Sequence, residues 1–235
     1  MPSSYAVVLA AVVLASQARA AEIAHLPART IDRDGVTVHF PAVTYQAPAP
    51  SGDPVTVVCA RMASDAVGVA VEPKRDLIAE TKHRVVFRDP RDARRLLKLY
   101  RPDHYEPVRV AKLIQRDLGV QTLLESLGLP VAAIDPAPRL IEHGVESQPF
   151  VAGQGLDDLY PQGYRTGTNP AVDRMLERVA AVDRPLRTIV SMQSGLVFTN
   201  TVDCHTDRPL GVDLGHCYAN IFLETAGGQP IFVDW

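Results

Sequence analysis

The sequence predicts an α+β fold in which an antiparallel sheet carries one helix. Three short β-prone runs separated by turns lie between residues 76 and 100. A helical periodicity follows over residues 108–127, and β-prone runs return near the C-terminus. With 235 residues, 46% hydrophobic and 22% charged, the chain can bury a core, which excludes global disorder.

Residues 1–20, MPSSYAVVLAAVVLASQARA, have the pattern of a signal peptide. The apolar stretch over residues 5–15 is too short to span a bilayer but has the length of a signal-peptide core. Ala18 and Ala20 are the small residues expected before cleavage at Ala21. We therefore expect a secreted or periplasmic protein with no membrane span after cleavage. The alternative is an uncleaved helix packed on the domain.

The charge balance gives no overall case for nucleic-acid binding, because 24 Lys and Arg face 27 Asp and Glu for a net charge of −3. Residues 82–116 differ, since 11 basic residues there face 4 acidic ones, a local charge of 11 − 4 = +7. This segment is either a basic surface over a phosphate-binding cleft or a solvated face.

Residues 21–54 are predicted to be an N-terminal extension and linker. A short β-prone run covers residues 36–40, and the Pro-rich stretch 47–54 cannot continue a strand or helix. Residues 55–71 are ambiguous. Asp53-Pro54 could begin a helix, yet residues 55–59 are β-prone.

Residues 55–152 are predicted to form the sheet-and-helix unit. Strands are expected over 76–79, 83–88 and 94–100, with a turn at 89–92. The helix over 108–127 should end at Gly128 and Pro130. Two further strands are expected around Gly144, over residues 139–142 and 147–151.

Residues 153–235 are predicted to mix helices with short strands. A short helical or turn segment is expected over 156–159. Asn169-Pro170 should open a helix to about Met192, which Pro185 is expected to kink or break. Strands are expected at the positions 210–212, 220–224 and 230–233, the last two joined by a turn at 227–228.

Four polar residues occur in an order that points to chemistry. Lys98 lies in an apolar strand, a helix with acidic residues follows, Asp213 and Asn220 flank a loop that enters a strand, and Asp234 ends the last strand. In this order residues 75–235 resemble the protein-kinase-like superfamily, especially its aminoglycoside-phosphotransferase-like and minimal bacterial kinase branches.

The resemblance implies a kinase-like N-lobe, an antiparallel sheet plus one helix, and a reduced C-lobe that is either truncated after residue 235 or minimal. It implies an ATP-dependent phosphotransferase acting on a protein or small-molecule hydroxyl. Lys98 would hold the α- and β-phosphates, with Asp117 as its helix partner and Glu125 as the less favoured choice. Val151 would offer backbone hydrogen bonds to the adenine.

By the same resemblance, Asp213 would accept or orient the proton of the attacking hydroxyl, and Asn220 and Asp234 would hold Mg²⁺. The sequence departs from the family pattern at several places, two of which bear directly on phosphate binding and the catalytic loop. Residues 80–84 are not Gly-rich, so Lys82 and Arg84 would have to attract the phosphates by charge. Asp213 and Asn220 are also seven residues apart, where the family typically has five.

Two other functions remain open at this point. The chain could be an exported pseudokinase-type binding protein without turnover, or an exported structural or metal-binding domain. Cys and His side chains that could bind Zn²⁺ are found at Cys204, His205, His216 and Cys217. A Cys204–Cys217 disulfide is a second possibility for an exported chain. The third possibility is that Cys59, Cys204 and Cys217 are independent thiols.

Overall fold

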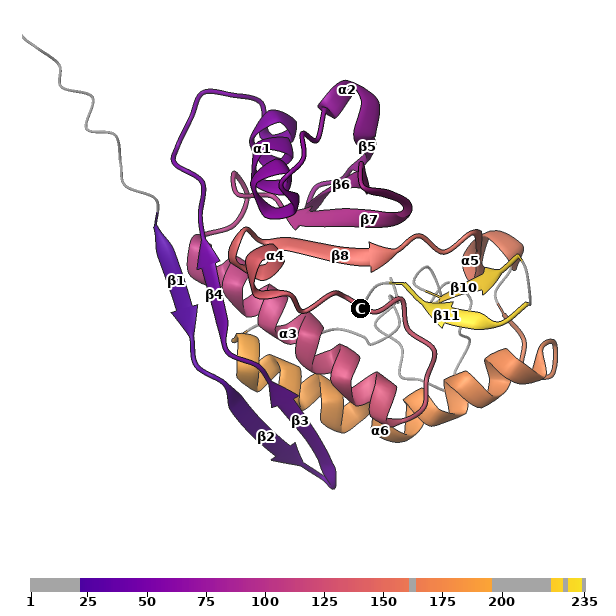
Figure 1. The fold of residues 1–235 in the computed structure, drawn as a ribbon. Helices are drawn as coiled ribbons and strands as arrows, with labels where there is room; N and C mark the ends of the chain where they lie inside the picture. The colour runs from indigo at the N-terminus through magenta and orange to yellow at the C-terminus, as the bar shows by residue number, and fades with distance from the viewer. Residues whose placement is uncertain (1–21, 161–163, 196–220, 226–227, 234–235) are drawn as a thin grey trace, which may run out of the picture.

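The computed structural model describes residues 22–160, 164–195, 221–225 and 228–233. They form a mixed α+β structure built around a four-stranded antiparallel sheet (Figure 1). Its strands, in spatial order, are β5 (Leu77–Glu80), β6 (Arg84–Asp89), β7 (Asp92–Tyr100) and β8 (Val145–Pro149). The strands expected between residues 76 and 100 are confirmed.

The two faces of this sheet differ in chemistry. Alternation along β6 and β7 puts buried apolar residues, among them Val85, Phe87 and Leu97, on one face. Helix α1 (Val55–Val67) lies over that face in Figure 1. The opposite face carries charged residues and meets α3 (Pro107–Ser126).

The ambiguous run after residue 54 is therefore a helix rather than a strand. The buried positions of α1 include Cys59 and three alanines, whose small side chains let the helix approach the sheet closely. The helix ends at Gly68, whose φ of 74° is the left-handed conformation that favours glycine. After it come α2 (Pro73–Asp76) and the edge strand β5.

The N-terminal segment is part of the core. Strand β1 (Ile23–Leu26) pairs with β4 (Val43–Gln46), and β2 (Arg29–Arg33) pairs with β3 (Val36–Phe40). Both pairs lie against α3 (Figure 1). Phe40 and Tyr45 are each 1% exposed, so residues 23–46 complete the hydrophobic core, and residues 47–54, which follow, form neither helix nor strand.

One sequence expectation in the sheet-and-helix unit is wrong. Residues 139–142, expected as a strand, belong to the short helix α4 (Pro138–Glu142). Pro138 stands at the first helical position, where its missing N–H costs no hydrogen bond, and Leu140 N and Ile141 N both donate to Ala137 O. Gly144, with a φ of 70°, then redirects the chain into β8.

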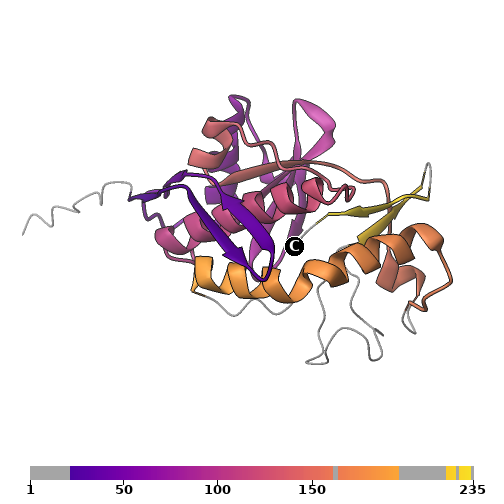
Figure 2. The same cartoon turned by 90° about the horizontal axis from the view of Figure 1, so that it is seen from below.

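The C-terminal part is a small sheet beside a long helix. Strands β9 (Gly153–Gly155), β10 (Ile221–Glu224) and β11 (Pro230–Phe232) pair in the order β11-β10-β9, and α5 (Leu156–Leu159) follows β9. Helix α6 (Pro170–Ser194) passes alongside α3 and the β2–β3 hairpin (Figure 2). It continues through Pro185 without a break. The strand expected over 210–212 lies outside the described residues.

None of the helices in the described part of the chain combines the length and the apolar character needed to cross a bilayer. Residues 1–20 lie outside that part, so cleavage of a signal peptide stays a prediction.

The contact between Gly119 of α3 and Phe40 of β3 predicts a measurable loss of stability. A Cβ atom at Gly119 would come within 2.5 Å of the Phe40 ring. We expect Gly119→Ala to lower the free energy of unfolding by about 1–3 kcal/mol in urea titrations, because overpacking outweighs the gain in helix propensity. Gly52→Ala is the control, since its Cβ would meet nothing within 4 Å. Adding Phe40→Leu to Gly119→Ala should recover part of the lost stability. If the changes in unfolding free energy of the two substitutions were simply additive, the predicted clash would be contradicted.

Cys59 should be unreactive in the folded protein. Its side chain is fully buried, and burial, followed by the nearby Asp103 carboxylate, raises the pKa of the thiol to about 12. Iodoacetamide at pH 8 should therefore leave Cys59 unmodified until denaturant is added, as read by peptide mass mapping. Modification of Cys59 under native conditions would show that α1 does not protect it.

Candidate functional site

Lys98 lies at the centre of the candidate site. It stands on β7, an inner strand, and its side chain is only 9% exposed. Its Nζ donates a hydrogen bond of 2.8 Å to the main-chain oxygen of Val233, directly after β11. A buried lysine therefore joins the four-stranded sheet to the end of the C-terminal hairpin, one residue before Asp234.

The strand register brings two further charged residues beside Lys98. Lys98 is the cross-strand partner of Glu146 on β8. Arg84 on β6 is the cross-strand partner of Tyr100 on β7. The Arg84 guanidinium lies 3.1 Å from a Glu146 carboxylate oxygen and 4.3 Å from the centre of the Tyr100 ring. The sequence analysis did not identify Glu146, although an acidic residue within a strand that is otherwise buried can indicate a functional or paired charge.

Helix α3 supplies the remaining members of this group. Asp117 Oδ2 lies 2.8 Å from Arg84 Nη2 and accepts a hydrogen bond of 2.5 Å from the Tyr100 hydroxyl. Arg116 Nε donates to Asp117 Oδ1 at 2.6 Å. We call Arg84, Lys98, Tyr100, Arg116, Asp117 and Glu146 the buried charge network.

Burial makes these contacts necessary. The carboxylates of Asp117 and Glu146 are each 1% exposed, and a desolvated carboxylate without a partner costs several kcal/mol. Burial, the largest single influence, lowers the pKa of Arg116, but the Asp117 carboxylate and Tyr100 together raise it by more, so the net shift of this pKa is upward. Burial also raises the pKa of Tyr100 well above its ordinary value, so its hydroxyl stays protonated. Three cations then face two carboxylates, which leaves the network with a net positive charge.

The expected site residues are partly brought together. Lys98, Arg84 and Asp117 belong to the buried charge network, and the Asp117 carboxylate accepts hydrogen bonds from Arg84, Arg116 and Tyr100. Glu125 lies two turns further along α3 and accepts a hydrogen bond from Gln121. Lys82 is exposed on the turn between β5 and β6.

Residues 150–152 join the two sheets, since β8 ends at Pro149 and β9 begins at Gly153. Phe150 N donates to Arg94 O on β7, and Thr225 N, after β10, donates to Ala152 O. Val151, the residue expected to contact adenine, is half-buried between these two bonds.

The turn expected to cover the phosphates is held by polar contacts. Thr81 Oγ1 accepts hydrogen bonds from the main-chain N–H groups of His83 and Arg84. The His83 ring shares a 2.5 Å hydrogen bond with the Tyr105 hydroxyl. Burial, then His104 and nearby basic residues, lowers the pKa of His83, so this imidazole is biased toward its neutral form.

Several expected site residues lie outside the described residues: Asp213, Asn220 and Asp234, and the proposed zinc ligands Cys204, His205, His216 and Cys217. Among the residues that the structure does describe, no group of three or more His, Cys, Asp or Glu side chains is arranged to hold a metal ion.

Comparison with known proteins finds no matching family model, no matching curated protein and no matching solved structure.

The buried charge network predicts a large effect of removing one carboxylate. Asp117→Asn keeps the shape of the side chain but leaves two arginines without their shared counter-charge. We expect a loss of about 3–5 kcal/mol in the free energy of unfolding, measured by urea titration. Arg94→Gln removes a guanidinium from a side chain that is 89% exposed and should leave the unfolding midpoint unchanged. Equal effects of the two substitutions would show that burial does not govern the network.

Proposed function

We propose that the chain is an ATP-dependent phosphotransferase of kinase-like architecture that acts on a protein or small-molecule hydroxyl. The observation that carries the proposal is the hydrogen bond from Lys98 on an inner strand to the main chain of Val233. It puts a cation beside the residue that precedes Asp234, the expected Mg²⁺ ligand. The proposal includes export through residues 1–20.

The arrangement of elements supports a nucleotide site at this position. A four-stranded antiparallel sheet carries α3 on its charged face, and residues 150–152 lead from β8 into the small sheet β9–β11. The kinase-like lobe pair that we propose consists of these two parts, with residues 55–152 as the N-lobe. Phe150 is 46% exposed and Val151 half-buried, so this connection offers an apolar surface for a base.

The charges of the site suit phosphoryl transfer. A triphosphate requires cations that offset its charge, and phosphoryl transfer depends mainly on positioning and electrostatic stabilisation. In the proposal Lys98 contacts the phosphates and Arg84 adds positive charge above them. Asp117 and Glu146 hold Arg84 in place, and so act as positioning residues. Asn220 and Asp234 would bind Mg²⁺, and Asp213 would orient the acceptor hydroxyl.

One observation favours a second function, a pseudokinase-type binding protein without turnover. Asp117, the helix acid expected beside Lys98, is bound by Arg84, Arg116 and Tyr100. Lys98 itself donates to a main-chain oxygen. A lysine and an acid engaged in this way can hold the two sheets together without positioning phosphates for transfer.

Nucleotide binding and turnover separate the two functions. We expect Mg²⁺-ATP to bind the mature protein in calorimetric titrations, and Lys98→Met to weaken binding roughly 10- to 100-fold, because a charge-assisted hydrogen bond contributes about 1.5–3 kcal/mol. Arg33→Gln, on β2 and with a side chain that is 56% exposed, lies outside the proposed site and should bind as the wild type does.

Release of phosphate from ATP should then require Asp213, so Asp213→Asn should retain ATP binding and lose turnover. ATP binding without turnover by the wild type would favour the pseudokinase function. Lack of any Mg²⁺-dependent nucleotide binding would exclude both.

A further inference from the structure

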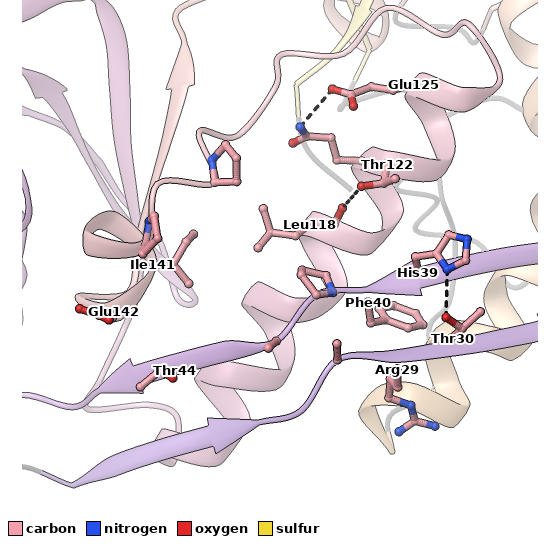
Figure 3. A pocket seen from close by; sticks show the side chains of 16 residues that line it. Arg29, Thr30, His39, Phe40, Thr44, Leu118, Thr122, Glu125, Ile141 and Glu142 are labelled. Carbon is pink, nitrogen blue, oxygen red and sulfur yellow. Dashed lines mark hydrogen bonds between the residues drawn. The ribbon is translucent and has the colours of Figure 1, made fainter.

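A cavity lies on the outer side of α3, away from the buried charge network. It has a volume of about 860 Å³, within the range typical of small-molecule sites. Figure 3 shows its walls: the strands around His39 and Thr44, helix α3 from Leu118 to Glu125, and the segment containing Ile141. Nothing in the proposed phosphotransferase chemistry uses this cavity.

The base of the cavity is apolar. Phe40, Leu118 and Ile141 line it but are each at most 8% exposed, so the apolar surface open to a ligand comes mainly from the exposed rings of Pro41, Pro136 and Pro138. Burying apolar atoms against such a surface contributes roughly 25 cal/mol for each Å² removed from water. The cavity therefore suits a ligand with an apolar body rather than a fully hydrated ion.

The edges of the cavity are acidic. Glu125 and Glu142 lie at different edges, with Leu118 and Ile141 between them (Figure 3), and Arg29 is the one basic residue of the lining apart from His39. Glu142 is exposed and has no ion pair among the described residues. Glu125 accepts a hydrogen bond from the neutral Gln121 amide. Two carboxylates against one guanidinium favour a cationic group on the ligand.

We propose that this cavity binds a small amphipathic amine, with its apolar body on Pro41, Pro136 and Pro138 and its ammonium group at Glu142 or Glu125. An amine with these two features satisfies both the base and the edges of the cavity. A neutral analogue gains only the apolar contact, and an anionic analogue is repelled by the carboxylates.

Hydrogen bonds joined by two short stretches of the main chain lead from this cavity to Lys98. Gln121 donates to Glu125 and accepts from Ile134 N at 2.7 Å. The segment just before Ile134 pairs with β11, because Ala132 N donates to Phe232 O and Phe232 N donates to Pro130 O.

The residue after Phe232 is Val233, whose oxygen accepts the bond from Lys98. A cation that binds Glu125 changes the first bond of this series. We therefore infer that binding of the amine also changes the hydrogen bonding around Lys98. Any effect of the amine on nucleotide affinity rests on the proposed function, whereas binding of the amine itself does not.

Three matched probes test the binding site: phenethylamine, 2-phenylethanol and phenylacetate, titrated calorimetrically into the full mature chain at low salt. We expect phenethylamine to bind at least 10-fold more tightly than phenylacetate, with 2-phenylethanol between them. The double variant Glu125→Gln/Glu142→Gln should reduce the affinity for phenethylamine to that for 2-phenylethanol. Glu177→Gln, an exposed glutamate on α6 outside the cavity, should change nothing. Ala42→Phe, which adds a ring to the lining, should abolish binding of all three probes.

Equal affinity for the three probes, an unchanged affinity in the double variant, or no binding at millimolar concentration would overturn the amine site. Amide hydrogen exchange tests the connection to Lys98 without any nucleotide. Saturating phenethylamine should slow exchange at Ala132 and Phe232 several-fold in the wild type and not in the double variant. Amine binding without slower exchange at these amides would overturn the connection to Lys98 but not the amine site. Absence of both amine binding and slower exchange would overturn both inferences, and the nucleotide titrations would still test the phosphotransferase proposal separately.

Discussion

The structure depends on how charges are compensated on one face of the four-stranded sheet. Arg84, Lys98 and Glu146 project from three adjacent strands into a space with little water. Their desolvation is tolerable only where partners approach, and α3 and the end of β11 provide them through Asp117, Arg116 and the Val233 oxygen. Because these partners are 16 to 135 positions away from the strand residues that they meet, the network fixes the packing of distant parts of the chain.

Local signals were sufficient for the strands of the main sheet and for α3, where periodicity and flanking turns agree with the tertiary structure. These local signals failed where a short segment could form either a helix or a strand. Residues 139–142 are apolar enough for a strand, but Pro138 begins a helical turn and Gly144 ends it. The β-prone residues 55–59 became helical because α1 must present Cys59 and Ala63 to the sheet. Tertiary contacts decided these segments, and a single sequence does not reveal them.

The candidate site was predictable to a similar extent. A lysine within an apolar strand is unusual enough to be noticed, and Lys98 indeed lies on an inner strand beside the C-terminal hairpin. The partner of Asp117 was harder to predict from the sequence, because the strand register and the rotation of α3 together bring Arg84 to that carboxylate. Glu146 was missed for the same reason, since its position opposite Lys98 follows from the pairing of β7 with β8, 48 residues apart at that pair.

Helix α3 is the element that these observations have in common. One side of it supplies Arg116 and Asp117 to the buried charge network, and another side, from Leu118 to Glu125, forms a wall of the outer cavity. Gly119 allows Phe40 to contact the helix backbone, and Gln115 donates to the main-chain oxygens of Pro27 and Pro41. The N-terminal strands therefore hold α3 against the sheet. A helix restrained on both sides has few independent movements, so a ligand that shifted its outer side would also act on Asp117, which holds Arg84.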